Sequence, residues 1–157
     1  MLKFALDTAD ISEYGKIAAF LKANGLEFSD EQLKAPANDM LKMWKVTQGL
    51  KNQSDDIVAA CILCSRKGYY VVSDIAVDWP MRKSGLGRLL MKKAENEVKK
   101  LGGNEIWLVA KVPEFYEKLG YKRMTFDASP DLFSCAHCGH NGSDCFPVVM
   151  TKSLAQE

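Results

Sequence analysis

Hydrophobic residues recur at helical spacing in the first part of the chain. The pattern follows Asp10 and Glu13, a pair with the spacing that caps a helix start. Asn24-Gly25 is a typical helix end, and Ser29 opens a second short helix that Pro36 closes. The positions expected on the buried face of the first helix are Ile11, Tyr14, Ala18 and Leu21.

The spacing changes to that of strands from residue 40 onward. Runs rich in β-branched and aromatic residues alternate with polar turns, which predicts an antiparallel meander. Further along, a short strand and a closing strand pair follow. The predicted strands are Leu2–Leu6, Met40–Thr47, Ile57–Cys64, Tyr69–Val77, Glu105–Ala110, Tyr121–Phe126 and Phe146–Lys152.

The clearest helical pattern covers Gly85–Leu101. Glu95 and Lys99 within it form a favourable ion pair four residues apart. A shorter helix, Pro113–Leu119, begins with proline, and its Phe115 is expected in the core. The apolar stripe of the long helix comprises Leu86, Leu89, Leu90, Ala94, Val98 and Leu101.

Length and charge narrow the class of protein. The chain has 157 residues, about one ordinary domain, with no repeat or linker. Hydrophobic residues make up 47% and charged residues 26%, the balance of a soluble folded protein. A net charge of +1 argues against a nucleic-acid binder, and no stretch is typical of a membrane span or signal peptide. We predict one α+β domain over residues 1–157, in the cytoplasm, without nucleic-acid or membrane partners.

The segment between the predicted strand that ends with Asp74–Val77 and the long helix has the features of an anion site. The first amides of a helix have no internal partner, and the helix dipole favours negative charge there. Gly85 and Gly87 leave the backbone accessible to a phosphate, although glycines also begin ordinary helices. Neither a dinucleotide fingerprint nor a P-loop is present. Positive charge is added by Arg82, Lys83 and Arg88.

The run from Asp74 to Met124 resembles the GNAT superfamily of N-acetyltransferases. Arg82, Gly85 and Gly87 match its R/Q-x-x-G-x-G/A signature, and residues 114–121 resemble its fourth helix and following turn. The sequence before that helix lacks the asparagine that many members carry. The resemblance implies a mixed, mostly antiparallel central sheet flanked by helices, and transfer of an acetyl group from acetyl-CoA to a primary amine.

The same resemblance implies roles for individual residues. The backbone of one strand would pair with the pantetheine arm, and the amides of the following turn would hold the pyrophosphate. Tyr116 would be the acid that protonates the leaving thiolate. Asp74 would be the base, or would anchor a water that relays the proton. The expected cofactor contacts are Ile75, Ala76, Val77, Arg82, Lys83, Ser84, Gly85, Leu86, Gly87 and Arg88.

Two other functions fit parts of the sequence. One is a non-catalytic module that senses acyl-CoA or binds a partner, and the other is a zinc-dependent interaction domain. The presence of both Asp74 and Tyr116 favours the enzyme. The acceptor of this enzyme would be an amine on a small molecule or a peptide. A homodimer is one possible oligomeric state.

A cysteine-rich insertion, residues 127–145, separates the two closing strands of the predicted C-terminal hairpin. It holds three of the five cysteines and both histidines. A structural zinc site needs four ligands. Free thiols, a redox-active pair and an iron–sulfur ligand set are the alternatives, whereas Cys61 and Cys64 are expected in the core. The candidate zinc ligands are Cys135, Cys138, Cys145 and His140, with His137 as a substitute for the last.

Overall fold

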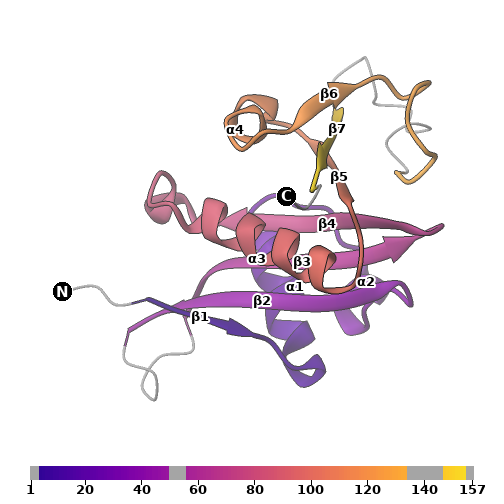
Figure 1. The fold of residues 1–157 in the computed structure, drawn as a ribbon. Helices are drawn as coiled ribbons and strands as arrows, with labels where there is room; N and C mark the ends of the chain where they lie inside the picture. Colours follow the sequence, from indigo (N-terminus) through magenta and orange to yellow (C-terminus); the bar gives the residue numbers. More distant parts are fainter. Residues whose placement is uncertain (1–3, 50–55, 134–146, 155–157) are drawn as a thin grey trace. The chain divides into compact units, whose positions relative to one another are not determined.

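The computed structural model describes residues 4–49, 56–133 and 147–154. Its seven strands form one mixed sheet in the order β1-β2-β3-β4-β5-β7-β6, which confirms the predicted α+β class (Figure 1). The cysteine-rich insertion lies largely outside the described residues. The chain divides into two compact units: the first is Met1–Cys64 with Val72–Ala94, and the second is Ser65–Val71 with Glu95–Glu157.

Antiparallel pairing joins the first strands of the sheet. Leu6 lies opposite Val46, and Trp44 lies opposite Cys61. The turn after the third strand has positive φ at Lys67 and Gly68, as a two-residue hairpin requires. These observations confirm the predicted meander. The strands are β1 (Phe4–Thr8), β2 (Met40–Gln48), β3 (Ile57–Arg66) and β4 (Tyr69–Val77).

The helices of the first unit begin at the predicted caps. Asp10 and Glu13 form a capping box, and Ser29 forms a second one with Gln32. Ile11 was predicted on the buried face, but it is 58% exposed. The helical segment starts with a 3₁₀ turn, whose tighter winding takes Ile11 out of phase with the helix that follows. The elements are η1 (Ile11–Glu13), α1 (Tyr14–Ala23) and α2 (Asp30–Lys34).

The first helix packs against the sheet to form a core. Its buried residues meet the alternate side chains of β2 and β3 that face it. In Figure 1, α1 and α2 lie behind strands β2 to β4, and α3 lies in front of them. The core of this unit comprises Tyr14, Ile17, Ala18, Leu21, Met43, Ala60, Ile62 and Cys64.

The long helix, α3 (Leu86–Lys100), buries a different arc from the one predicted. Four of the six predicted positions are buried, but Leu89 and Leu101 are exposed. Leu101 lies beyond the helix end, and Leu89 lies outside the buried arc. Met91 and Glu95 complete that arc. Sequence spacing therefore identified the helix but misplaced the edge of its buried face.

The second unit is built around β5 (Glu105–Ala110). β7 (Val148–Ser153) pairs antiparallel with β5, and β6 (Lys122–Met124) pairs antiparallel with β7. Val71 of β4 lies opposite Trp107 of β5 in a parallel pair. The remaining elements are α4 (Pro113–Glu117), which follows β5, and η2 (Trp79–Met81), which follows β4 in the first unit. Within the described residues, no helix has the length and apolar character needed to cross a membrane.

Candidate active site

The turn between β4 and α3 exposes backbone amides at the start of a helix. Lys83 has φ of +70° and Gly85 has φ of +89°, so both adopt the left-handed conformation. That conformation is costly for a lysine and is typical of functional turns. The amide of Leu89 is bonded to the carbonyl of Gly85, so helix geometry leaves the amides of Leu86 to Arg88 outside the helical ladder.

The space above this turn is open. A Cβ placed on Gly85 would meet no atom within 4 Å. Gly85 is therefore required by its backbone conformation and not by packing in the protein. The side chains of Arg82, Lys83 and Arg88 are exposed around the turn. Free amides, open space and three positive charges make this turn suited to bind a phosphate.

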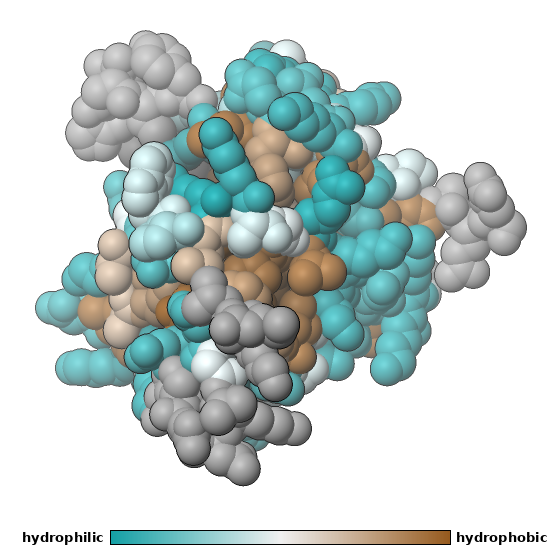
Figure 2. All heavy atoms as spheres, turned by 90° about the vertical axis from the view of Figure 1, so that its left-hand side faces the viewer, coloured by the Kyte–Doolittle hydropathy of each residue, from teal (hydrophilic) through white to brown (hydrophobic). Residues whose placement is uncertain are grey.

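Arg82 is oriented by its neighbours in the first unit. Its guanidinium lies 4.6 Å from the centroid of the Trp79 ring, and its Nε donates to the Val77 carbonyl at 3.3 Å. Trp79 itself is a large side chain that is 73% exposed. Figure 2 shows one face of the molecule, on which hydrophobic residues interrupt the hydrophilic surface. Sequence reasoning missed Trp79, although a tryptophan in a polar turn is a signal that could have identified it.

The strand that leads into the turn carries Asp74. All residues from Ser73 to Val77 are half-buried, in contrast to the buried Val71 and Val72. Ser73 Oγ donates to Asp74 Oδ2 at 2.8 Å, and Cys64 Sγ donates to Ser73 Oγ at 3.4 Å. Asp74 is thus held by a short polar chain that the sequence analysis did not predict.

The charge of Asp74 affects the groups around it. Burial and, secondarily, the Asp74 carboxylate raise the pKa of the Tyr14 hydroxyl. Burial and then the same carboxylate raise the pKa of the Cys61 thiol. Tyr14 Oη donates to the Gln32 carbonyl at 2.5 Å, which links α1 to α2. Cys61 and Cys64 are both buried, which confirms that they are core residues.

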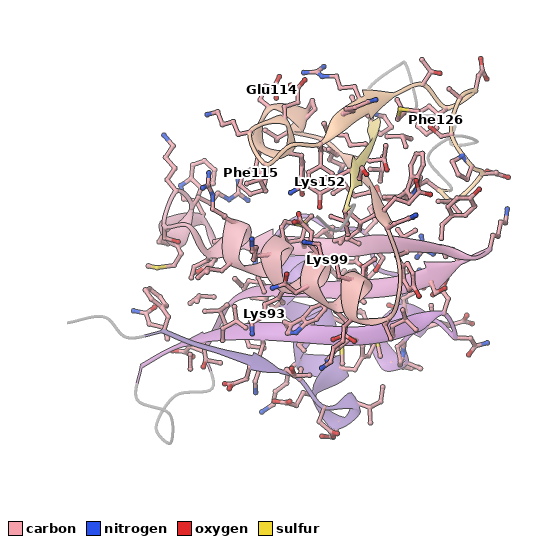
Figure 3. The ribbon with its side chains drawn as sticks, viewed as in Figure 1. Lys93, Lys99, Glu114, Phe115, Phe126 and Lys152 are labelled. Atoms are coloured by element: carbon pink, nitrogen blue, oxygen red, sulfur yellow. The ribbon has the colours of Figure 1, made fainter. Side chains whose placement is uncertain are left out.

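Tyr116 lies on α4 in the second unit and is half-buried. Its ring packs edge-to-face with Phe115 at 4.9 Å and with Tyr121 at 6.0 Å between centroids. Phe115 was predicted in the core, but it is exposed. A helix of five residues turns only once and buries one side, which Pro113 and Tyr116 occupy. Figure 3 shows Phe115 and Glu114 on opposite sides of this helix.

The predicted site residues fall into three groups. Asp74 and the candidate phosphate-binding turn lie in the first unit, and Tyr116 lies in the second. The four candidate zinc ligands lie outside the described residues. Within the described ranges, no group of three or more metal-binding side chains occurs. The zinc site therefore stays a prediction, which metal analysis of freshly purified protein would decide.

Comparison with known proteins identifies the family. Residues 44–123, a little more than half of the chain, match the Acetyltransferase (GNAT) domain family. The chain is 28% identical over 106 residues to an uncharacterised N-acetyltransferase of Chlorobaculum tepidum, covering 63% of this chain and 68% of the relative.

Solved structures share the fold at low sequence identity. The ribosomal-protein-S18-alanine N-acetyltransferase of Escherichia coli matches with a TM-score of 0.69 and 17% identity, over 99% of this chain and 96% of that chain. NAA60 of Arabidopsis thaliana in complex with acetyl-CoA matches with a TM-score of 0.70 and 10% identity, over 97% and 99% of the two chains. The solved structures share the fold, and the family match shows that the chain belongs to the GNAT acetyltransferase family and is an N-acetyltransferase.

Proposed function

We propose that the chain transfers an acetyl group from acetyl-CoA to a primary amine by direct attack. The amine nitrogen bonds to the thioester carbonyl carbon, and the carbon–sulfur bond breaks as the tetrahedral intermediate collapses. One proton leaves the amine, and one reaches the coenzyme A thiolate. The observation that carries this proposal is the turn from Lys83 to Arg88, which follows β4 and η2 and has left-handed residues at the start of α3, where helix amides lack helical partners.

The proposed proton transfers use Asp74 and Tyr116. Asp74 accepts the amine proton, directly or through a water, and its half-buried position and bond from Ser73 support that role. Tyr116 donates to the thiolate. A phenol, with an ordinary pKa of about 10, is protonated at neutral pH and so has a proton to donate to the departing thiolate. The backbone from Ile75 to Val77 binds the pantetheine arm in this proposal.

The proposed acceptor is an amine on a small molecule or a peptide. An amine is cationic before it loses its proton, and the Asp74 carboxylate supplies negative charge in the half-buried part of β4. The relative from Escherichia coli is named for the alanine of a ribosomal protein, so a peptide amine is one candidate class. The two units together form one acetyltransferase domain in this proposal, since the family match includes residues of both.

Acetyl-CoA binding and turnover test the proposed function. Acetyl-CoA at 100 times its dissociation constant should stabilise the folded protein by about 2.7 kcal/mol, which thermal unfolding can measure. Thiol release should then appear with at least one member of a panel of primary amines. No stabilisation would reject the cofactor site. Stabilisation without amine-dependent thiol release would reject the enzyme and favour the sensor.

A further inference from the structure

Glu95 is the one charged side chain that is buried in the described part of the chain. It is 6% exposed and lies on α3 one residue from Ala94 and three from Val98, both also buried. A carboxylate removed from water needs partners that compensate for its lost hydration. Tyr121 Oη donates to Glu95 Oε2 at 2.8 Å, and Lys152 Nζ donates to Oε1 at 3.0 Å.

The two partners of Glu95 also contact each other. Lys152 Nζ lies 5.6 Å from the centroid of the Tyr121 ring, within the range of a cation–π interaction. The stem of Lys152 passes over Gly120, because a Cβ on Gly120 would lie 3.3 Å from its Cε. In the view of Figure 3, Lys152 extends from β7 and Phe115 extends from α4. Lys152 therefore packs on the turn that connects α4 to β6.

Tyr121 in turn fixes Tyr116. The Tyr121 amide donates to the Tyr116 carbonyl at 3.1 Å, and the two rings pack edge-to-face at 6.0 Å with an interplanar angle of 73°. The backbone contact sets the end of α4, and the ring contact restricts rotation of the Tyr116 side chain. Anything that holds the Tyr121 ring therefore also limits where the Tyr116 hydroxyl can lie.

We propose that Glu95, Lys152 and Tyr121 are positioning residues that hold Tyr116 where its hydroxyl meets the leaving thiolate. The proposal rests on the proposed acid role of Tyr116. Well-packed apolar side chains would stabilise the fold as well as a buried ion pair does. The ion pair adds a directional contact instead. The hydrogen bond from the Tyr121 hydroxyl to Glu95 fixes the orientation of the Tyr121 ring more tightly than apolar packing would.

Tyr121→Phe tests the proposal, since it removes one hydroxyl and keeps the ring. We expect kcat to fall by about tenfold, because a small displacement of a catalytic group is enough for such a loss. The KM for acetyl-CoA should change little. Tyr69→Phe is the matched control: Tyr69 belongs to the same unit, packs on Trp107, and should keep the kcat of the unmodified protein.

A double-variant cycle separates positioning from a purely structural role. If Tyr121 acts through Tyr116, Tyr121→Phe should cause no further loss of kcat in a Tyr116→Phe background. Additive losses, or an unchanged kcat in Tyr121→Phe alone, would overturn the positioning role and leave the acid role standing. An unchanged kcat in Tyr116→Phe would overturn the acid role and the positioning role together.

The ion pair provides a second test that does not alter Tyr121. Glu95→Gln keeps an acceptor for the Tyr121 hydroxyl but leaves the Lys152 ammonium without its counter-charge, so kcat should fall. Glu95→Gln combined with Lys152→Met removes the uncompensated charge and should restore most of kcat. Failure of the second substitution to restore it, in protein with an unchanged thermal midpoint, would contradict the proposal.

Discussion

Gly85 meets a backbone requirement and, in the proposed cofactor site, a ligand requirement as well. Its φ of +89° disfavours any side chain, and the space where a Cβ would lie is empty in the protein. Lys83 adopts the same left-handed conformation without being a glycine. Strain of this kind is typical of functional turns, and here it lies directly before the start of α3.

Gly85→Ala should therefore damage cofactor binding beyond its effect on stability. The left-handed backbone should cost about 1–2 kcal/mol of unfolding free energy. A methyl group in the phosphate position should also raise the KM for acetyl-CoA by roughly tenfold, as loss of a hydrogen bond to a charged group would. Steady-state kinetics and urea unfolding measure the two effects.

Gly25→Ala is the control for that prediction. Gly25 has φ of +96° and, like Gly85, open space at its Cβ, but it lies at the end of α1. The substitution should cost similar stability and leave the KM for acetyl-CoA unchanged. Equal KM values in the two variants would remove Gly85 from the cofactor site.

Residue identity alone gave part of the site. Arg82, Gly85 and Gly87 could be recognised because their spacing is a local property of the chain. Cys64, which reaches Asp74 through Ser73, and Glu95, which reaches Tyr116 through Tyr121, could not be recognised because they lie on other elements. Glu95 shows the limit most clearly: it was predicted to pair with Lys99, four residues away, yet its carboxylate bonds to Tyr121 and Lys152.

At the scale of elements, local sequence signals predicted where helices start more accurately than which of their faces are buried. The Asp10 and Ser29 caps lie where the sequence placed them because capping depends on three or four consecutive residues. The errors at Ile11 and Leu89 concern which side of a helix packs. The buried face of a helix depends on how tightly its first turn is wound and on the surface against which the helix packs. Neither can be read from the spacing of hydrophobic residues along one helix.

Glu13 links the first cap to the sheet and predicts a pH effect. A hydrogen bond from Lys45, and then one from the Asp10 amide, hold the pKa of Glu13 below its ordinary value of 4.5. Because the pKa of Glu13 is lower in the folded protein than in the unfolded chain, the ionised carboxylate stabilises the fold at a pH above the unfolded pKa. This contribution is lost as the pH falls through the folded pKa. The pair is partly exposed, so it should contribute about 0.5 kcal/mol or less.

Glu13→Gln isolates this contribution, because glutamine can still accept the Asp10 amide in the capping box. Urea unfolding at neutral pH should show the variant slightly less stable. Below about pH 4 the difference should shrink, since protonated Glu13 resembles glutamine. A difference that stayed constant between pH 7 and pH 3 would show that the ion pair is not its source.

At the scale of the whole molecule, the sequence predicted the order of elements but not every neighbour. The closing strands Lys122–Met124 and Val148–Ser153 do pair, as expected. β7 also inserts between β5 and β6, so that Lys152 reaches Glu95 from 57 residues away. Long-range pairing is set by how the elements share a core, and no local pattern encodes it. The comparisons confirm the family that the Arg82, Gly85 and Gly87 spacing indicated, and the proposal of a single domain follows from a family match that includes residues of both units.

Tryptophan fluorescence can test that proposal, because each unit contains a buried tryptophan. Trp44 is on β2 in the first unit, Trp107 is on β5 in the second, and both are buried. Trp79→Phe removes the exposed third tryptophan, and adding Trp44→Phe or Trp107→Phe leaves one reporter in each protein. If the chain is one cooperative domain, fluorescence and circular dichroism should give the same urea midpoint within each variant. A fluorescence midpoint that departs from the circular dichroism midpoint, in opposite directions for the two reporters, would mean that the units unfold separately and would reject the single domain.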